Sequence, residues 1–394
     1  MSAKPLPAIS YGRQSIDEAD IAAVVAVLRS DFITQGPAIA RFEASVARFT
    51  GAQHAVAVAN ATAALHIGAL ALGLGPGDRL WTSPNTFVAS ANCGLYCGAQ
   101  VDFVDIDPRT YNLSVSALEV KLEAAAKNGT LPKVLVPVHF SGQPCEMDEI
   151  STLCARHGVR VMEDASHAIG AEYRGEKIGG RPHADLTVFS FHPVKILTTG
   201  EGGMLLTNDG GLYEKLIRLR SHGITRDARF MSGESDGPWY YQQVELGFNY
   251  RMTDIQAALG ASQMERLPAF LARRRELAAR YDSLLAGLPL ITPWQHPYTH
   301  SAWHLYVVRP DAARTAVTRM ALYEGLRRRG IHPQVHYIPV HTQPWYRGLG
   351  FKDSDFPESV RYYSGTLSLP MYYSLSDADQ DRVVAALKEL LDTP

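Results

Sequence analysis

The stretch Asp185–Lys195, DLTVFSFHPVK, runs on into ILTTGEGG over residues 196–203, and the rest of the chain is best understood from it. The apolar, β-branched run Leu186–Phe191 predicts a buried strand bounded by turn residues, and Met204–Thr207 predicts another. Between them lies Lys195, in a segment rich in hydroxyl groups and glycine. A lysine at the mouth of an apolar strand can lose its proton and attack a carbonyl, although an isolated loop lysine is more often simply solvated.

Four further segments favour the chemical interpretation of this lysine. They are ANATAALH (59–66), PNTFVASAN (84–92), MEDASHAIG (162–170) and GFNYRMTDIQAALG (247–260). Together with SFHPVKILTTGEGG they resemble, in the same order, segments of the DegT/DnrJ/EryC1/StrS family of sugar aminotransferases, which use pyridoxal phosphate. The resemblance covers nearly the whole chain, and five motifs in the family's order are far more specific than any one of them alone.

Length and the resemblance together predict an α/β protein of two domains. At 394 residues the chain is too long for one compact core. The resemblance implies a fold-type I aminotransferase, with a mostly parallel seven-stranded sheet in the large domain and a smaller C-terminal α+β domain. Gly287 and Pro289 stop a long helical pattern, so we expect the large domain over 1–287 and the small domain over 288–394.

Composition argues against several other classes of protein. The formal net charge is −2, from 38 basic and 40 acidic residues, and no charge run indicates a nucleic acid or a membrane surface. The four cysteines show no CxxC pattern, which favours reduced core residues over a metal site. His332, His336 and His341 lack the HExxH spacing of a metal site. With no signal segment at the start and no apolar run long enough to span a bilayer, we expect a cytoplasmic protein.

Several local patterns predict secondary structure that the three-dimensional structure can test. Pro268 is expected to separate a helix over 255–267, capped by Thr253, from one over 270–285. We expect a strand over 334–337 and a helix that is capped by Ser376 and runs to Leu391. Residues 224–243 predict an exposed excursion, and the arginine triplets 273–275 and 327–329 are most simply solvated helix faces.

A strand, a tight turn and a helix start follow one another at residues 55–72, which predicts a phosphate site. The turn Asn60–Thr62 leaves unpaired N–H groups at the positive end of the helix. Asn60 or Thr62 could equally serve only as a helix cap. In the company of Lys195, phosphate binding by Ala61 and Thr62 is the better interpretation.

Glu163 and Asp164 come at the end of a predicted strand, the edge at which open α/β sheets bind ligands. Strand alternation points them to opposite faces, so only one of them should reach a ligand. The resemblance implies that Asp164 faces the cofactor's ring nitrogen, that His167 faces its 3-hydroxyl and that Phe87 stacks on the ring. A packed polar histidine and an ordinary core phenylalanine are the alternatives for His167 and Phe87.

The resemblance implies two overlapping sets of contact residues. The cofactor set is Ala61, Thr62, Phe87, Asp164, His167, Ser190, Lys195 and Asn249. The substrate set is Tyr11, Asp31, Phe32, Ile33, Thr34, Ala61, Ser190, Asn249, Gln334, Val335, His336 and Tyr337. The chain is expected to form a homodimer in which Asn249 reaches the second copy's cofactor phosphate, although this asparagine could instead be a turn residue. Arg251 and Asp254 could form a local ion pair.

The implied activity is transfer of an amino group from L-glutamate to a nucleotide-linked keto-sugar, with Lys195 as the catalytic residue. Within the family the segments most resemble the branch of pseudaminic acid synthesis, which aminates C4 of UDP-2-acetamido-2,6-dideoxy-β-L-arabino-hex-4-ulose for bacterial surface glycans such as those on flagellin. Amination of C4 or C3 in another UDP-, GDP- or dTDP-keto-sugar, for lipopolysaccharide or an antibiotic, is the alternative. A related sugar dehydratase would carry histidine in place of Lys195, and a regulator on this fold would need a DNA-binding element.

Overall fold

A computed structural model describes residues 7–180 and 183–392, and its centre is a seven-stranded sheet. In spatial order the strands are β2 (His54–Val58), β10 (Gly203–Thr207), β9 (Leu186–Ser190), β6 (Arg160–Asp164), β5 (Val134–Val136), β3 (Arg79–Thr82) and β4 (Gln100–Phe103). β10 runs antiparallel to both of its neighbours, and every other pair in the sheet is parallel. The predicted seven-stranded, mostly parallel sheet is confirmed.

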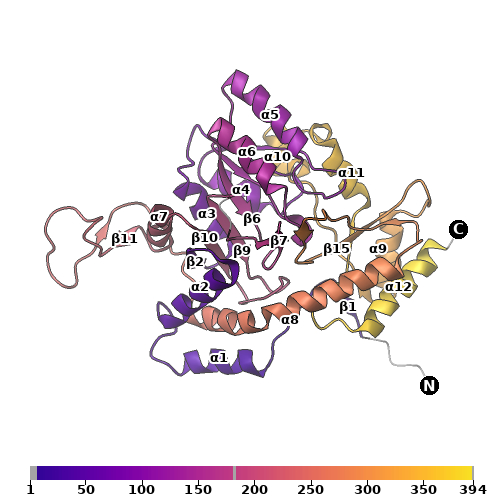
Figure 1. Cartoon of the computed structure of the whole chain (residues 1–394), viewed down its shortest axis with the longest axis horizontal. Helices are drawn as coiled ribbons and strands as arrows, with labels where there is room; N and C mark the ends of the chain where they lie inside the picture. Colours follow the sequence, from indigo (N-terminus) through magenta and orange to yellow (C-terminus); the bar gives the residue numbers. More distant parts are fainter. Residues whose placement is uncertain (1–6, 181–182, 393–394) are drawn as a thin grey trace.

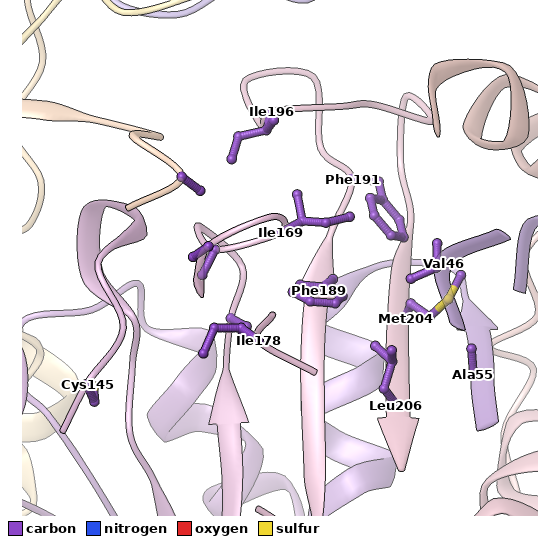
Figure 2. Packing of buried hydrophobic residues seen from close by; sticks show 14 of the residues in the cluster. Val46, Ala55, Cys145, Ile169, Ile178, Phe189, Phe191, Ile196, Met204 and Leu206 are labelled. Carbon is purple, nitrogen blue, oxygen red and sulfur yellow. The ribbon is translucent and has the colours of Figure 1, made fainter. Parts of the chain in front are cut away.

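Helices cover both faces of this sheet because its strands are apolar on both sides. Neighbouring residues such as Val188 and Phe189 enter different core clusters, as do Leu205 and Leu206. One cluster packs under α3 (Ala61–Ala71), α4 (Ala89–Tyr96) and α7 (Gly210–Arg220). The other packs under α2 (Pro37–Thr50), α5 (Val115–Asn128), α6 (Met147–His157) and the long helix α8. Figure 2 shows Phe189 and Leu206 in this second cluster.

Helix α8 (Asp254–Leu284) is one continuous helix of 31 residues along the lower side of the molecule (Figure 1). The predicted break at Pro268 is wrong. A proline removes one N–H from a helix interior, but buried Leu267, Phe270 and Leu271 pack α8 against the core on both sides of it. The start was predicted correctly, since Thr253 caps α8 in a capping box with Gln256.

The C-terminal residues build a second core. A three-stranded sheet of β13 (Leu290–Ile291), β15 (Tyr306–Pro310) and β17 (Leu367–Leu369) packs with α9 (Arg319–Arg328) and α12 (Asp377–Leu391). This cluster also contains Ile9, residues of the last turns of α8 from Leu277 onward, and Leu285, which caps the end of α8. Residues before position 288 thus contribute to the second core. The domain boundary between residues 287 and 288 stays a prediction.

Shorter elements complete the chain. They are α1 (Glu18–Leu28), the parallel pair β1 (Ile9–Ser10) and β16 (Ile331–His332), the ribbon β7 (Glu172–Tyr173), β8 (Glu176–Lys177) and β14 (Thr299–His300), α10 (Pro344–Gly348) and α11 (Pro357–Gly365). Ser376 caps α12 as predicted. The strand expected over 334–337 is wrong, because the paired residues are Ile331 and His332, and Gln334 makes only an isolated bridge to Ser368.

The excursion predicted over 224–243 protrudes from the body of the molecule (Figure 1). It is a hairpin with short strands, β11 (Ile224–Thr225) and β12 (Gln242–Gln243). Trp239 and Tyr241 are exposed on it, and Leu246 is exposed just beyond it.

Three findings bear on the compositional predictions. All four cysteines are free and buried, as expected of reduced core residues. Within residues 7–180 and 183–392, no group of three or more His, Cys, Asp or Glu side chains could hold a metal ion. Over the same ranges, no helix is both long and apolar enough to cross a membrane.

Candidate active site

A cavity of about 500 Å³ lies at the carboxyl ends of β5, β6 and β9, where the topology of an open α/β sheet places a ligand. The beginning of α3 lines another part of it, and segments from the C-terminal core close it. Ten of the predicted site residues line this cavity. They are Tyr11, Ala61, Thr62, Phe87, Asp164, His167, Ser190, Lys195, His336 and Tyr337.

Lys195 reaches the cavity from the turn that follows β9. Its N–H donates to the His192 carbonyl (2.9 Å), and the Thr198 hydroxyl donates to the Phe191 carbonyl (2.9 Å), so the turn is closed at both ends. Burial lowers the pKa of Lys195 from its ordinary value of 10.5 to about 8, although the Asp164 carboxylate acts in the opposite direction. At neutral pH, a larger fraction of Lys195 is therefore the neutral, nucleophilic amine than would be the case for a solvated lysine.

The carboxylate of Asp164 is held in place by two hydrogen bonds, one to each oxygen. Ser90 donates its hydroxyl to Oδ2 (2.6 Å), and the Ser166 N–H donates to Oδ1 (3.1 Å). Glu163 faces the other side of the strand, where it accepts a hydrogen bond from Thr187 (2.6 Å). Of the two acids, Asp164 lines the cavity and Glu163 does not, in agreement with strand alternation.

The turn before α3 has the geometry of an anion site. Asn60 caps α3 by accepting the Ala63 N–H (2.8 Å), which leaves the N–H groups of Ala61 and Thr62 without an acceptor inside the helix. Gly203 of β10 makes room for this turn, because a Cβ there would lie 2.6 Å from the Ala61 nitrogen. Helix capping and phosphate binding are thus compatible, because Asn60 caps α3 while the N–H groups of Ala61 and Thr62 can bind a phosphate.

Aromatic and imidazole rings form another part of the cavity lining, which is called the wall below. His167 Nε2 shares a hydrogen bond with the Tyr337 hydroxyl (3.1 Å), and the His167 and His304 rings lie 4.3 Å apart. Burial, Lys195 and His336 hold the pKa of His167 well below its usual range, so this imidazole is neutral. Its Nδ1 is buried and has no hydrogen-bond partner among the described residues, as expected of a group that awaits a ligand.

Phe87, Tyr11 and His336 complete the wall. Phe87 is 58% exposed, which a core phenylalanine would not be, and its ring centroid lies 6.3 Å from that of Tyr337. Tyr11 and His336 have ring centroids 5.2 Å apart, and His336 Nδ1 shares a hydrogen bond with the Ser368 hydroxyl (2.8 Å). An exposed phenyl face at a cavity suits stacking on a flat ring.

Seven predicted residues lie outside the cavity lining of a single chain: Asp31, Phe32, Ile33, Thr34, Asn249, Gln334 and Val335. The 31–34 segment is exposed and tied to the start of α8, where the Asp254 N–H donates to the Ile33 carbonyl (3.1 Å). Asn249 is exposed beside Ser221. The carboxylate of Asp254 is used by the N–H groups of Gly36 and Ala38, so an ion pair with Arg251 is not formed.

The structure adds residues that the sequence did not indicate. Ser90 lies inside the PNTFVASAN segment, but nothing in that segment shows that its hydroxyl meets Asp164. His304 lines the cavity from the C-terminal core, far along the chain from every motif. A lone histidine carries no signal of its own, so only the fold could identify it.

These groups define a class of enzyme. A lysine with a lowered pKa, a fixed carboxylate and a free helix N-terminus fit, respectively, the aldehyde, the ring nitrogen and the phosphate of pyridoxal phosphate. Together with the sheet topology, this is the arrangement of a fold-type I, pyridoxal phosphate-dependent aminotransferase.

Comparison with known proteins identifies the family. Residues 14–388 match the DegT/DnrJ/EryC1/StrS aminotransferase family, and the chain belongs to it. Its members are pyridoxal phosphate-dependent sugar aminotransferases. A spore coat polysaccharide biosynthesis protein, SpsC of Bacillus subtilis (strain 168), is 42% identical over 386 residues, covering 97% of each chain.

Solved structures agree with this assignment. Helicobacter pylori PseC, an aminotransferase involved in the biosynthesis of pseudaminic acid, aligns with a TM-score of 0.89 and 31% identity over 98% of this chain and 100% of that one. The sugar aminotransferase Spr1654 of Streptococcus pneumoniae, in its PLP form, aligns with a TM-score of 0.87 and 28% identity over 98% of this chain and 99% of that one.

Proposed function

We propose that this sugar aminotransferase transfers the amino group of L-glutamate to C4 of UDP-2-acetamido-2,6-dideoxy-β-L-arabino-hex-4-ulose, giving UDP-4-amino-4,6-dideoxy-N-acetyl-β-L-altrosamine for pseudaminic acid. The observation that carries the chemistry is the meeting of Lys195 and Asp164 in one cavity. The choice of substrate is supported by the likeness to PseC along the full length of both chains.

Each residue has a role that follows from its position. Asp164 is held by Ser90 and Ser166, and its carboxylate would stabilise a proton on the ring nitrogen of bound cofactor. Ala61, Thr62 and Ser190, which line the cavity, would hold the phosphate end. Bound pyridoxal phosphate supplies an aldehyde and an electron-withdrawing ring, which together allow an amino group to leave the donor and enter the ketone.

Lys195 has two tasks. Its neutral amine would hold the cofactor, and its free amine would act as the general base that moves the donor's α-proton. His167 is neutral and hydrogen-bonded to Tyr337, so it can hold the 3-hydroxyl without placing a second positive charge beside Lys195. Asn249, exposed on its own chain, is proposed to complete the phosphate site of a second copy in a homodimer.

The B. subtilis relative supports a second candidate. SpsC is named for spore coat polysaccharide biosynthesis and is more identical to this chain, at 42%, than PseC is at 31%. A different UDP-, GDP- or dTDP-linked keto-sugar, aminated at C4 or C3 for another surface polysaccharide, fits the same cavity chemistry.

A product assay separates the two candidates. The purified enzyme with pyridoxal phosphate and L-glutamate receives the β-L-arabino 4-keto sugar nucleotide and, separately, its D-xylo epimer, and NMR identifies the aminated carbon. Amination of the first sugar alone is the expected result. Amination of only the second, or of neither while glutamate still changes the cofactor absorbance, would refute the pseudaminic acid assignment and keep the aminotransferase.

A further inference from the structure

Arg274, in the middle of the 273–275 arginine triplet, does not lie on the solvated helix face expected for it. Its neighbour Arg273 is partly exposed, pairs with Asp377 (2.7 Å) and donates to the Leu375 carbonyl (2.8 Å). Arg274 is only 2% exposed and points from α8 into the interior. The expectation for this member of the triplet is wrong, because α8 is buried along a whole stripe that includes position 274.

In the part of the chain that the structure describes, the hydrogen bonds of the guanidinium go from one nitrogen, Nη1, to carbonyl groups, and Nε is buried without a partner. Arg274 Nη1 donates to the carbonyls of Trp303 (3.1 Å), His304 (3.2 Å) and Met371 (3.1 Å). Among the described residues it forms no ion pair with a carboxylate. Burial lowers its pKa to about 10, so it remains a cation at neutral pH. An unpaired buried charge is costly, and stability alone would be served as well by an apolar side chain.

Two of these contacts lead directly to the cavity. The ring of His304 lines it, 4.3 Å from the ring of His167. The N–H of Met371 donates to the Tyr11 carbonyl (2.9 Å), and the Tyr11 ring also lines the cavity. One guanidinium therefore connects two parts of the wall that are almost 300 positions apart in the sequence.

The segment that carries His304 is also held from the opposite side. The N–H groups of Ala302 and Leu305 donate to the carbonyls of Gly142 (3.0 Å) and Ser141 (3.2 Å). Gly142 approaches so closely that a Cβ on it would lie 2.9 Å from the Trp303 nitrogen. The chain at 302–305 is thus clamped between this turn and Arg274.

We infer that Arg274 is a positioning residue that sets the substrate-facing wall of the site, by fixing His304 through its own carbonyl and Tyr11 through Met371. The inference applies to any keto-sugar that the cavity accepts, so it does not depend on the pseudaminic acid assignment. A misplacement of about 1 Å in the groups that position a substrate, caused by a change far from the chemistry, is enough to alter the kinetics of an enzyme by about 100-fold.

The test compares Arg274→Met, which removes the donors, with Arg274→Lys, which retains an ammonium, and with Arg273→Met as the matched control on the same helix. Hydrogen exchange of the cofactor-free protein is followed at the amides of Ala302, Leu305 and Met371. We expect these amides to exchange about tenfold or more faster in Arg274→Met, less so in Arg274→Lys, and unchanged in Arg273→Met.

Kinetics provides the second readout. With the sugar nucleotide identified by the product assay, KM should rise about tenfold in Arg274→Met, with a smaller change in kcat and partial recovery in Arg274→Lys. Wild-type exchange at the three amides, or equal effects of Arg273→Met and Arg274→Met, would overturn the inference. If Arg274→Met does not fold, Arg274→Lys against Arg273→Met decides it. If no sugar is turned over, the exchange data still decide it, and only the proposed substrate fails.

Discussion

At the scale of single residues, the chemistry depends on the protonation state of Lys195. Its pKa is lowered to about 8, so the amine is mostly protonated below pH 8 and mostly neutral above it. Only the neutral amine attacks an aldehyde. The rate at which the cofactor-free protein attaches pyridoxal phosphate should therefore fall about tenfold per pH unit below the pKa and level off above it.

Stopped-flow absorbance between about pH 6 and about pH 10 measures this rate profile. Lys195→Ala is the control and should show no covalent attachment and no transaminase activity. A midpoint near 10.5, the ordinary value for lysine, would mean that the amine is solvated and that burial has no effect on it.

At the scale of elements, Asp254 joins two helices that are distant in sequence. It is the first residue of α8, and its buried carboxylate accepts the N–H groups of Gly36 (2.7 Å) and Ala38 (2.8 Å) at the start of α2. Because Gly36 has no side chain to cap α2, Asp254 supplies the cap. Asp254→Asn should lower the free energy of unfolding by about 1–3 kcal/mol, measured by urea denaturation.

The matched control for that substitution is Asp377→Asn. Asp377 also lies in the first turn of a helix, but it is 60% exposed in a surface ion pair. Its loss should cost less than about 1 kcal/mol. If the two substitutions cost the same, the carboxylate of Asp254 does not stabilise the junction of α2 and α8.

At the scale of the whole molecule, the two ends of the chain share one core. Ile9 of β1 pairs with Ile331 of β16 and is 2% exposed within the C-terminal cluster. Ile9→Ala should cost about 2–5 kcal/mol in the free energy of unfolding, because it leaves a cavity in that cluster. Ile16→Ala, at a position that is 44% exposed, should change stability by less than about 0.5 kcal/mol. Chemical denaturation measures both changes. If Ile9→Ala lowered the free energy of unfolding as little as Ile16→Ala, β1 would be dispensable for the second core.

Much of the fold could be predicted because its signals are local. The run Leu186–Phe191, the cap at Thr253 and the cap at Ser376 each depend on neighbouring residues, and each was located correctly. Pro268 was misjudged because its local preference to end a helix is outweighed by distant side chains that pack on both sides of it. For the same reason Ile331 and His332, rather than 334–337, form the strand: their partner is the remote segment at Ile9.

Sequence alone determined the chemical identity of the site: the lysine, the acid at the strand end and the helix start are recognisable from residue type and order. Tertiary structure alone decided which other groups meet them. Ser90 reaches Asp164 across 74 positions, and Arg274 reaches His304 and Met371 through carbonyl groups that any residue could supply. Every residue has a backbone carbonyl, so the residue type does not show which carbonyl will accept a hydrogen bond. Long-range contacts form only when separate elements pack. The sequence therefore reveals the reacting groups, whereas the framework that holds them appears only in the folded chain.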